Sequence, residues 1–225
     1  MSRRAIVLVI SILTALGFAA AAFFYDRYSA SEETPPVAPV ASSLVRFHSP
    51  VIGTANAPVT IVEFFDPSCE ACSAFYPIVK RIVNASFGQV RLVVRYAPLH
   101  HGSDTAVRII EAARLQDKYW EALERALAAQ PQWAAHDRPQ PLLIWDVIGD
   151  IGLDMAKARA DADGPAVDQV LRQDIADMQV LKVNRTPGFF VNGTPLRDFG
   201  EAPLKALVEQ ELKKGSSQTT ENKAR

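Results

Sequence analysis

The sequence is poor in cysteine and has almost no excess of one charge. Only two of its 225 residues are cysteine, and the formal net charge at pH 7 is -1. A disulfide framework is excluded, because Cys69 and Cys72 close a loop too short to restrict the unfolded chain. No long basic run is present to neutralise a phosphate backbone, so we expect no nucleic-acid partner.

A second pair of cysteines is missing as well, which bears on metal binding. Structural zinc takes four ligands, and Cys69 and Cys72 supply two. The adjacent His100 and His101 could supply the rest, but neighbouring residues on a short connection are poorly placed to bind one ion together with this pair. We interpret both histidines as ordinary loop residues, and expect no metal and no cofactor other than a redox-active disulfide.

One long apolar run lies near the N-terminus. Residues 5–25 carry no charge and follow Arg3 and Arg4. A helix of this length spans roughly 30 Å, the thickness of the hydrocarbon core of a bilayer. We predict a signal anchor over residues 1–28 that crosses the inner membrane once, with the arginines in the cytoplasm and the remainder in the periplasm or another extracytoplasmic space. A cleaved signal peptide is the alternative.

Three segments follow the predicted anchor. Residues 29–48 contain three prolines and no apolar periodicity, which predicts a partly extended linker. Residues 49–214 are predicted to form one folded domain of ordinary size. Residues 215–225 are polar without an apolar face, so we expect a disordered tail.

The predicted domain alternates between strand and helix patterns. Residues 58–65 and 90–96 are rich in β-branched and aromatic residues, as buried strands are. Between them, residues 69–85 have apolar positions spaced by three and four, which predicts a helix. This strand-helix-strand unit requires a crossover and a parallel pairing, so the expected class is α/β. Helical patterns then fill about 103–182, before a hairpin signal at 188–196.

Cys69 is predicted to lie where the first strand turns into the helix. Unpaired backbone N–H groups and the positive end of the helix dipole favour a thiolate there, and the thiolate is the form that attacks disulfides. Cys72 lies one helical turn further on, beneath the first cysteine. We therefore assign Cys69 as the residue that reacts with the partner and Cys72 as the one that resolves the mixed disulfide.

Two motifs resemble a known family. The segment EFFDPSCEAC at 63–72 looks like the strand and active-site helix of DsbA-like thioredoxin-fold proteins, and TPGFFVNG at 186–193 resembles their second signature. The resemblance implies a thioredoxin fold in which Pro187 is cis and faces the cysteines. It also implies that Thr186 offers backbone hydrogen bonds to a substrate chain. Taken alone, Pro187 could instead simply begin a strand.

The resemblance carries two further implications. The separation of 115 positions between Cys72 and Pro187 leaves space for a helical insertion, which favours the DsbA-like branch over a minimal thioredoxin. Glu63 matches a position where the family often has a buried carboxylate. Its implied role is proton exchange with Cys72; a solvent-facing Glu at a strand edge is the alternative.

The dipeptide between the cysteines departs from the family pattern. Glu70 and Ala71 stand where strongly oxidising relatives have proline and histidine. A negative charge at Glu70 disfavours an anion at Cys69, although a Glu in the first turn suits the helix dipole. We expect a thiol-disulfide oxidoreductase of intermediate potential, acting as an oxidase or isomerase on protein substrates and recycled by a membrane or soluble redox partner.

Three other functions fit the same residues. The first is a membrane-anchored thiol reductase, for example in cytochrome maturation. The second is a copper- or zinc-binding thiol protein without redox turnover, and the third is a periplasmic holdase or scaffold. Insulin reduction, metal analysis of the reduced protein and trapping of mixed disulfides distinguish these functions.

Overall fold

The computed structural model of the protein describes residues 14, 17 and 43–223, with side chains as far as residue 215. The chain divides into two units, Met1–Pro39 and Val40–Arg225. In the first unit only Thr14 and Gly17 are described, and both are helical. The rest of the predicted anchor, and the predicted linker up to residue 42, lie outside the described residues. Among the residues that are described, no helix combines the length and the apolar character needed to cross a membrane.

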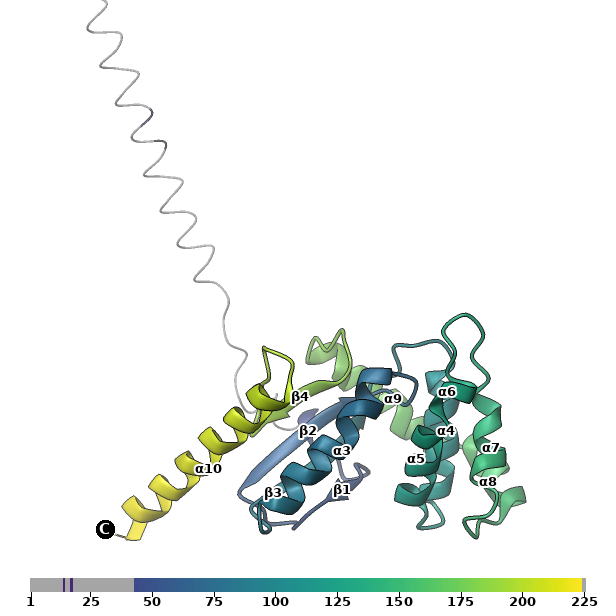
Figure 1. The fold of residues 1–225 in the computed structure, drawn as a ribbon, viewed down its shortest axis with the longest axis horizontal. Coiled ribbons are helices and arrows are strands. Elements are labelled where there is room, and N and C mark those ends of the chain that lie inside the picture. The colour runs from purple at the N-terminus through teal and green to yellow at the C-terminus, as the bar shows by residue number, and fades with distance from the viewer. Residues whose placement is uncertain (1–13, 15–16, 18–42, 224–225) are drawn as a thin grey trace, which may run out of the picture. The chain divides into compact units, whose positions relative to one another are not determined.

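A five-stranded sheet lies at the centre of the second unit, in the order β1-β3-β2-β4-β5 (Figure 1). β2 and β3 are parallel, and the other neighbouring pairs are antiparallel. Because β2 has a neighbour on each side and is covered on both faces, its sequence is almost continuously apolar. The strands are β1 (Val51–Ile52), β2 (Val59–Phe65), β3 (Val90–Tyr96), β4 (Gly188–Val191) and β5 (Thr194–Pro195).

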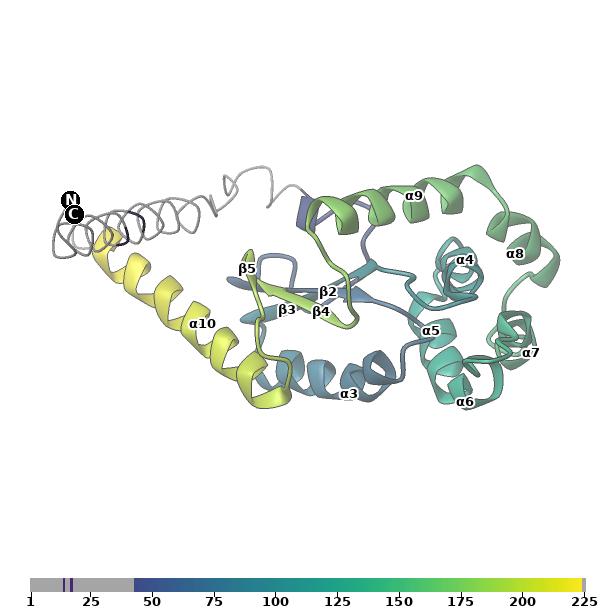
Figure 2. The same ribbon diagram turned by 90° about the horizontal axis from the view of Figure 1, so that it is seen from above.

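Helices cover both faces of the sheet. Figure 2 shows α3 (Glu70–Ala85) and α10 (Glu201–Lys223) on one face and α9 (Pro165–Val180) on the other. Successive β2 side chains point to opposite faces and so enter different clusters. Phe65 belongs to the main core with residues of α3, whereas Phe64 belongs to a smaller cluster with Met178 of α9.

The segment between β3 and β4 is helical, as expected for residues 103–182. Its apolar side chains, including the fully buried Ile110 and Trp133, extend the main core past the end of the sheet. Apart from α9, which covers one face, these helices lie beside the sheet in both views (Figures 1 and 2). They are α4 (Ser103–Arg114), α5 (Tyr119–Ala128), α6 (Gln130–Trp133), η1 (Pro141–Leu143), α7 (Ile144–Val147), α8 (Met155–Ala162) and α9.

The folded domain begins earlier than expected, because residues 43–48 of the predicted linker pack on it. Leu44 is buried, and its carbonyl oxygen accepts a hydrogen bond of 2.9 Å from the buried Arg95. The His48 ring contacts the carboxylate of Asp174 in α9 at 2.7 Å. Leu44 and His48, which the sequence predicts as part of the linker, are thus in contact with the folded domain. The contacts responsible join segments far apart in the chain, which composition does not reveal.

The last helix also continues further than expected. α10 extends to Lys223, through most of the segment 215–225 for which we predicted a disordered tail. The last proline of the chain is Pro203, so no later residue of α10 lacks a backbone donor for the helical hydrogen bonds.

Candidate active site

Cys69 lies at the junction that the sequence predicts, between the end of β2 and the start of α3. It is the N-cap residue of α3, with extended φ and ψ of -76° and 119°. Its backbone N–H donates to the carbonyl oxygen of Asp66 at 3.1 Å, which closes the turn. Its own carbonyl accepts from the N–H of Ser73 at 3.1 Å, the first hydrogen bond of the helix. The thiol is therefore placed against the unpaired N–H groups of the first helical turn.

The surroundings of Cys69 favour its thiolate. Both cysteines are free thiols, and Cys69 Sγ lies 3.4 Å from the carbonyl oxygen of Thr186. A hydrogen bond from the Cys72 thiol lowers the pKa of Cys69 most. Burial opposes this effect. The Thr186 side chain and the backbone of Cys72 and Ala71, but not the Thr186 carbonyl, support it, so that the pKa falls to about 5. At neutral pH Cys69 is an anion with only 6% of its surface exposed.

Cys72 lies one turn into α3 and has the opposite character. It is fully buried, and its Sγ accepts a weak hydrogen bond of 3.5 Å from the backbone N–H of Asp66. Burial, the neighbouring Cys69 and the charge of Glu63 all raise the pKa of the Cys72 thiol far above its ordinary value. Cys72 is thus a protonated, buried thiol beside an anionic one.

Glu63 lies in the interior, not at a solvent-facing strand edge. Its strand neighbours are Val94 of β3 and Phe189 of β4. The side chain is fully buried, and neither carboxylate oxygen has a hydrogen-bond partner among the described residues. Burial, followed by the negative charge of Cys69, raises the pKa of Glu63 to about 8. Because Glu63 raises the pKa of Cys72 in turn, the two groups are close enough to influence each other's protonation.

The second sequence motif meets the first across the sheet. Gly188 of β4 pairs with Phe64 of β2, so the residue before it in the chain lies at the end of β2. The peptide bond between Thr186 and Pro187 is cis. With the Thr186 carbonyl beside Cys69 Sγ, residues separated by 117 positions form one side of the site.

Asp66 and His100 were missed by the sequence analysis. The buried Asp66 carboxylate accepts hydrogen bonds from the backbone N–H groups of Ser68, Leu99 and His100, at 2.9, 2.8 and 2.9 Å, and from the Ser103 hydroxyl. The His100 ring contacts it through Nδ1 at 2.7 Å. His100 is therefore not an ordinary loop residue. No local pattern marks it, because it meets Asp66 across 34 positions of the chain.

Gln130, at the start of α6, is a second residue that the sequence did not reveal. Its buried side-chain amide donates to the carbonyl oxygen of Pro67 at 2.7 Å and to that of Cys69 at 3.1 Å. These two carbonyls lie in the turn before α3. The helical insertion therefore fixes the backbone of the active-site turn directly.

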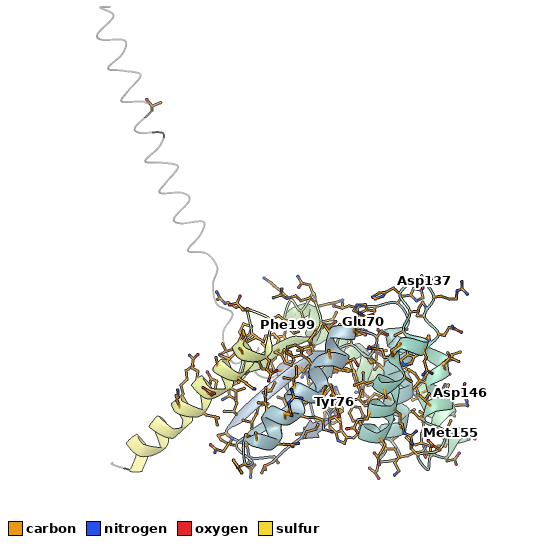
Figure 3. All side chains as sticks on the ribbon, viewed as in Figure 1. Glu70, Tyr76, Asp137, Asp146, Met155 and Phe199 are labelled. Carbon is orange, nitrogen blue, oxygen red and sulfur yellow. The ribbon has the colours of Figure 1, made fainter. Side chains whose placement is uncertain are left out.

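The outer edge of the site is apolar. Phe199, in the loop before α10, is 48% exposed, and its ring centroid lies 4.4 Å from that of Phe75 in α3. Phe75 in turn lies 5.9 Å from Phe189 of β4. Figure 3 shows Phe199 and Glu70, the exposed first residue of α3, near the same end of the domain. Among the described residues, no group of three or more His, Cys, Asp or Glu side chains is arranged to hold a metal ion.

Residues 47–210 match the thioredoxin family model. The chain is 31% identical over 165 residues to the Na(+)/H(+) antiporter NhaA of Herminiimonas arsenicoxydans, covering 73% of this chain and 25% of the antiporter. It therefore spans about a quarter of the length of that relative. Disulfide bond formation protein D of Bacillus subtilis is 26% identical, over 73% of this chain and 77% of its own.

Solved structures share the fold. A thioredoxin-like oxidoreductase from Silicibacter pomeroyi is 29% identical, with a TM-score of 0.65, over 78% of this chain and 96% of its own. Oxidised BdbD from Bacillus subtilis is 24% identical with a TM-score of 0.65, over 74% and 94% of the two chains, and supports the fold alone.

Proposed function

Because the chain belongs to the thioredoxin superfamily and to its DsbA-like thiol-disulfide oxidoreductases, we propose that it exchanges disulfides with protein substrates through Cys69 and Cys72. The observation that carries the proposal is the contrast between the two thiols. The pKa of Cys69 is lowered to about 5, and that of Cys72 is raised. Such a contrast between adjacent sulfurs suits one nucleophile and one resolving thiol.

The oxidase reaction begins with the Cys69–Cys72 disulfide. A substrate thiolate attacks Cys69 Sγ, the bond between the two cysteines breaks, and Cys72 leaves as a thiolate. The buried Glu63, protonated at neutral pH because its pKa is about 8, gives Cys72 its proton. A second substrate thiolate then attacks the first substrate sulfur and releases Cys69 as a thiolate. The substrate gains a disulfide, and its two electrons remain in the Cys69 and Cys72 dithiol until a membrane or soluble partner oxidises it.

The low pKa of Cys69 supports the oxidase or isomerase direction. Stabilising the thiolate stabilises the reduced protein, which makes the couple more oxidising. Glu70 carries a negative charge at the start of α3, but its side chain is exposed and solvent screens it. We therefore propose a potential between those of thioredoxin and the strongest oxidants. A redox titration against glutathione that gives a value as reducing as that of thioredoxin would refute the oxidase direction.

Substrate binding is proposed at the loop before β4 and the apolar edge beside it. Thr186 and Pro187 lie next to Cys69, where a substrate chain would pass. The exposed Phe199 offers an aromatic surface to such a chain. An extended peptide can form backbone hydrogen bonds there, which suits substrates of varied sequence.

We propose that this chemistry takes place outside the cytoplasm. The uncharged run at 5–25, preceded by two arginines, supports a single-pass anchor in the inner membrane with the domain in the periplasm. A cleaved, secreted form is the alternative. Disulfides persist in either location.

Capture of a mixed disulfide tests the proposed function. A Cys72→Ser variant cannot resolve the intermediate. We therefore expect it to accumulate covalent adducts with substrate proteins that have been reduced and reoxidised, and we expect dithiothreitol to release these adducts. The matched control is the Cys69→Ser, Cys72→Ser double variant, which should form none. If Cys72→Ser forms no more adducts than this control, and wild-type Cys69 is alkylated no faster at neutral pH than a free peptide thiol, the proposal is wrong.

A further inference from the structure

Asp66 contacts both cysteines and His100 at the same time. Its carbonyl oxygen accepts from the Cys69 N–H at 3.1 Å, and its N–H donates to Cys72 Sγ at 3.5 Å. Its carboxylate is 2.7 Å from Nδ1 of His100. If the ring swung away, a buried carboxylate would lose a charge-assisted partner, which is unfavourable. The His100 ring is therefore a fixed group at the edge of the active site, with 35% of its side chain exposed.

The groups around His100 favour its protonated form. Burial lowers the pKa of His100, but the hydrogen bond to Asp66 and the charges of Asp66, Cys69 and Glu70 raise it above the ordinary value of 6.5. Two further histidines lie nearby: His101, next in the chain, and His136, whose ring centroid lies 6.2 Å away. Because the pKa of Cys69 is about 5, an imidazolium at His100 and a thiolate at Cys69 coexist across the mildly acidic range.

We propose that His100, oriented by Asp66, is the cationic partner of the Cys69 thiolate and extends its reactivity to lower pH. The inference rests on the proposed function in taking Cys69 as the nucleophile. A cation supplied from the loop after β3 compensates for the anionic Glu70 between the cysteines. His100 acts on the anion across space, whereas Asp66 acts through His100 as a positioning residue.

The first test compares two replacements of His100. His100→Asn keeps a side-chain N–H for Asp66 but carries no charge, and His100→Ala removes both. In the reduced full-length protein, thiolate absorbance reports the titration of Cys69, because Cys72 stays protonated. We expect both variants to raise the midpoint by about half a pH unit, which lowers the thiolate fraction near pH 5 by about twofold. His101→Asn, a neighbouring exposed histidine, is the control and should leave the midpoint unchanged.

The second test measures how the Cys69 thiolate changes the pKa of His100. Coupling between two sites is reciprocal, so removal of the thiolate must lower the pKa of His100 by the amount that removal of the imidazolium raises the pKa of Cys69. An NMR titration of the His100 ring in wild type and in Cys69→Ser measures this shift. A purely structural role for His100 would leave its titration the same in the two proteins.

Two results would overturn the inference. One is a Cys69 midpoint in folded His100→Asn equal to that of wild type, and the other is a His100 titration that Cys69→Ser does not change. Either result leaves the proposed function intact if the Cys72→Ser protein still accumulates mixed disulfides. If His100→Ala does not fold, the His100→Asn and Cys69→Ser measurements still decide the question.

Discussion

Replacing Glu63 by glutamine should stabilise the reduced protein at pH 7 and make it a poorer catalyst. The pKa of Glu63 is about 8 in the folded state, against an ordinary value of 4.5. The folded state therefore holds this proton more tightly than the unfolded state. The stability associated with Glu63 is complete below about pH 4.5 and is lost as the pH rises toward 8. Glutamine has no proton to lose, so it removes this dependence.

The size of the effect follows from the same two pKa values. Between pH 4.5 and pH 7, an interval of about 2.5 pH units, the carboxyl is ionised in the unfolded state but still protonated in the folded state. Each of these units changes the free energy of unfolding by about 1.4 kcal/mol. Glu63→Gln should therefore raise the free energy of unfolding by about 3 kcal/mol at pH 7 relative to its effect at pH 4. Because the Glu63 oxygens have no hydrogen-bond partner among the described residues, the substitution breaks no hydrogen bond that would offset this gain.

Urea unfolding of the reduced protein between pH 4 and pH 8 measures the effect. Glu70→Gln is the matched control, since it removes an exposed carboxylate from the same site and should change the free energy of unfolding little at any pH. A difference between wild type and Glu63→Gln that stays constant from pH 4 to pH 7 would contradict the argument.

The same substitution, Glu63→Gln, should slow catalysis although it stabilises the fold. Without an acid beside it, Cys72 must leave as an unprotonated thiolate in a buried site that strongly disfavours the anion. In a single-turnover assay with a dithiol peptide at pH 7, Glu63→Gln should slow release of Cys72 on the order of 100-fold. Glu70→Gln should retain the wild-type rate within a fewfold factor. An undiminished rate in Glu63→Gln would remove Glu63 from the mechanism.

Two further predictions concern stability. Arg95→Ala leaves the buried carboxylates of Asp174 and Asp177 without their shared cation, so we expect a loss of about 3–5 kcal/mol in urea unfolding, against less than about 1 kcal/mol for Arg125→Ala at an exposed pair. Gln130→Leu removes the side-chain donor to the carbonyls of Pro67 and Cys69, of which the second keeps its bond from Ser73. Calorimetry should show a lower Tm and a loss of about 1–3 kcal/mol, whereas the exposed Gln132→Leu should change little. Equal effects in a variant and its control would refute either prediction.

The features that the sequence predicts are those set by local pattern. The spacing of apolar residues over short windows predicts the parallel strands β2 and β3, the helix between them and the helical insertion. The position of Cys69 follows as well, since a turn between a strand and a helix fixes the N-cap within a residue or two. Each of these depends on neighbours within a few positions.

The features that the sequence does not reveal depend on pairing at long range. Gln130 reaches Pro67 across 63 positions, and Arg95 reaches the carbonyl of Leu44 across 51. His100 is separated from Asp66 by two elements of secondary structure. A polar side chain in an unremarkable context gives no sign of which distant carbonyl or carboxylate it will meet. The active-site turn is therefore predictable, but the side chains that hold it are not.

The opposite pKa shifts of Cys69 and Cys72 follow from their spacing. Both thiols start from the same ordinary pKa of 9.0. One stands outside the helix against its free N–H groups, while the other lies one turn inside, on the face buried against β2 and Glu63. An additional residue between them would rotate the second thiol by about 100° around the helix axis and move it away from this face. The length of the dipeptide Glu70-Ala71 therefore decides whether Cys72 lies against β2 and Glu63, whereas its composition changes the charge beside Cys69.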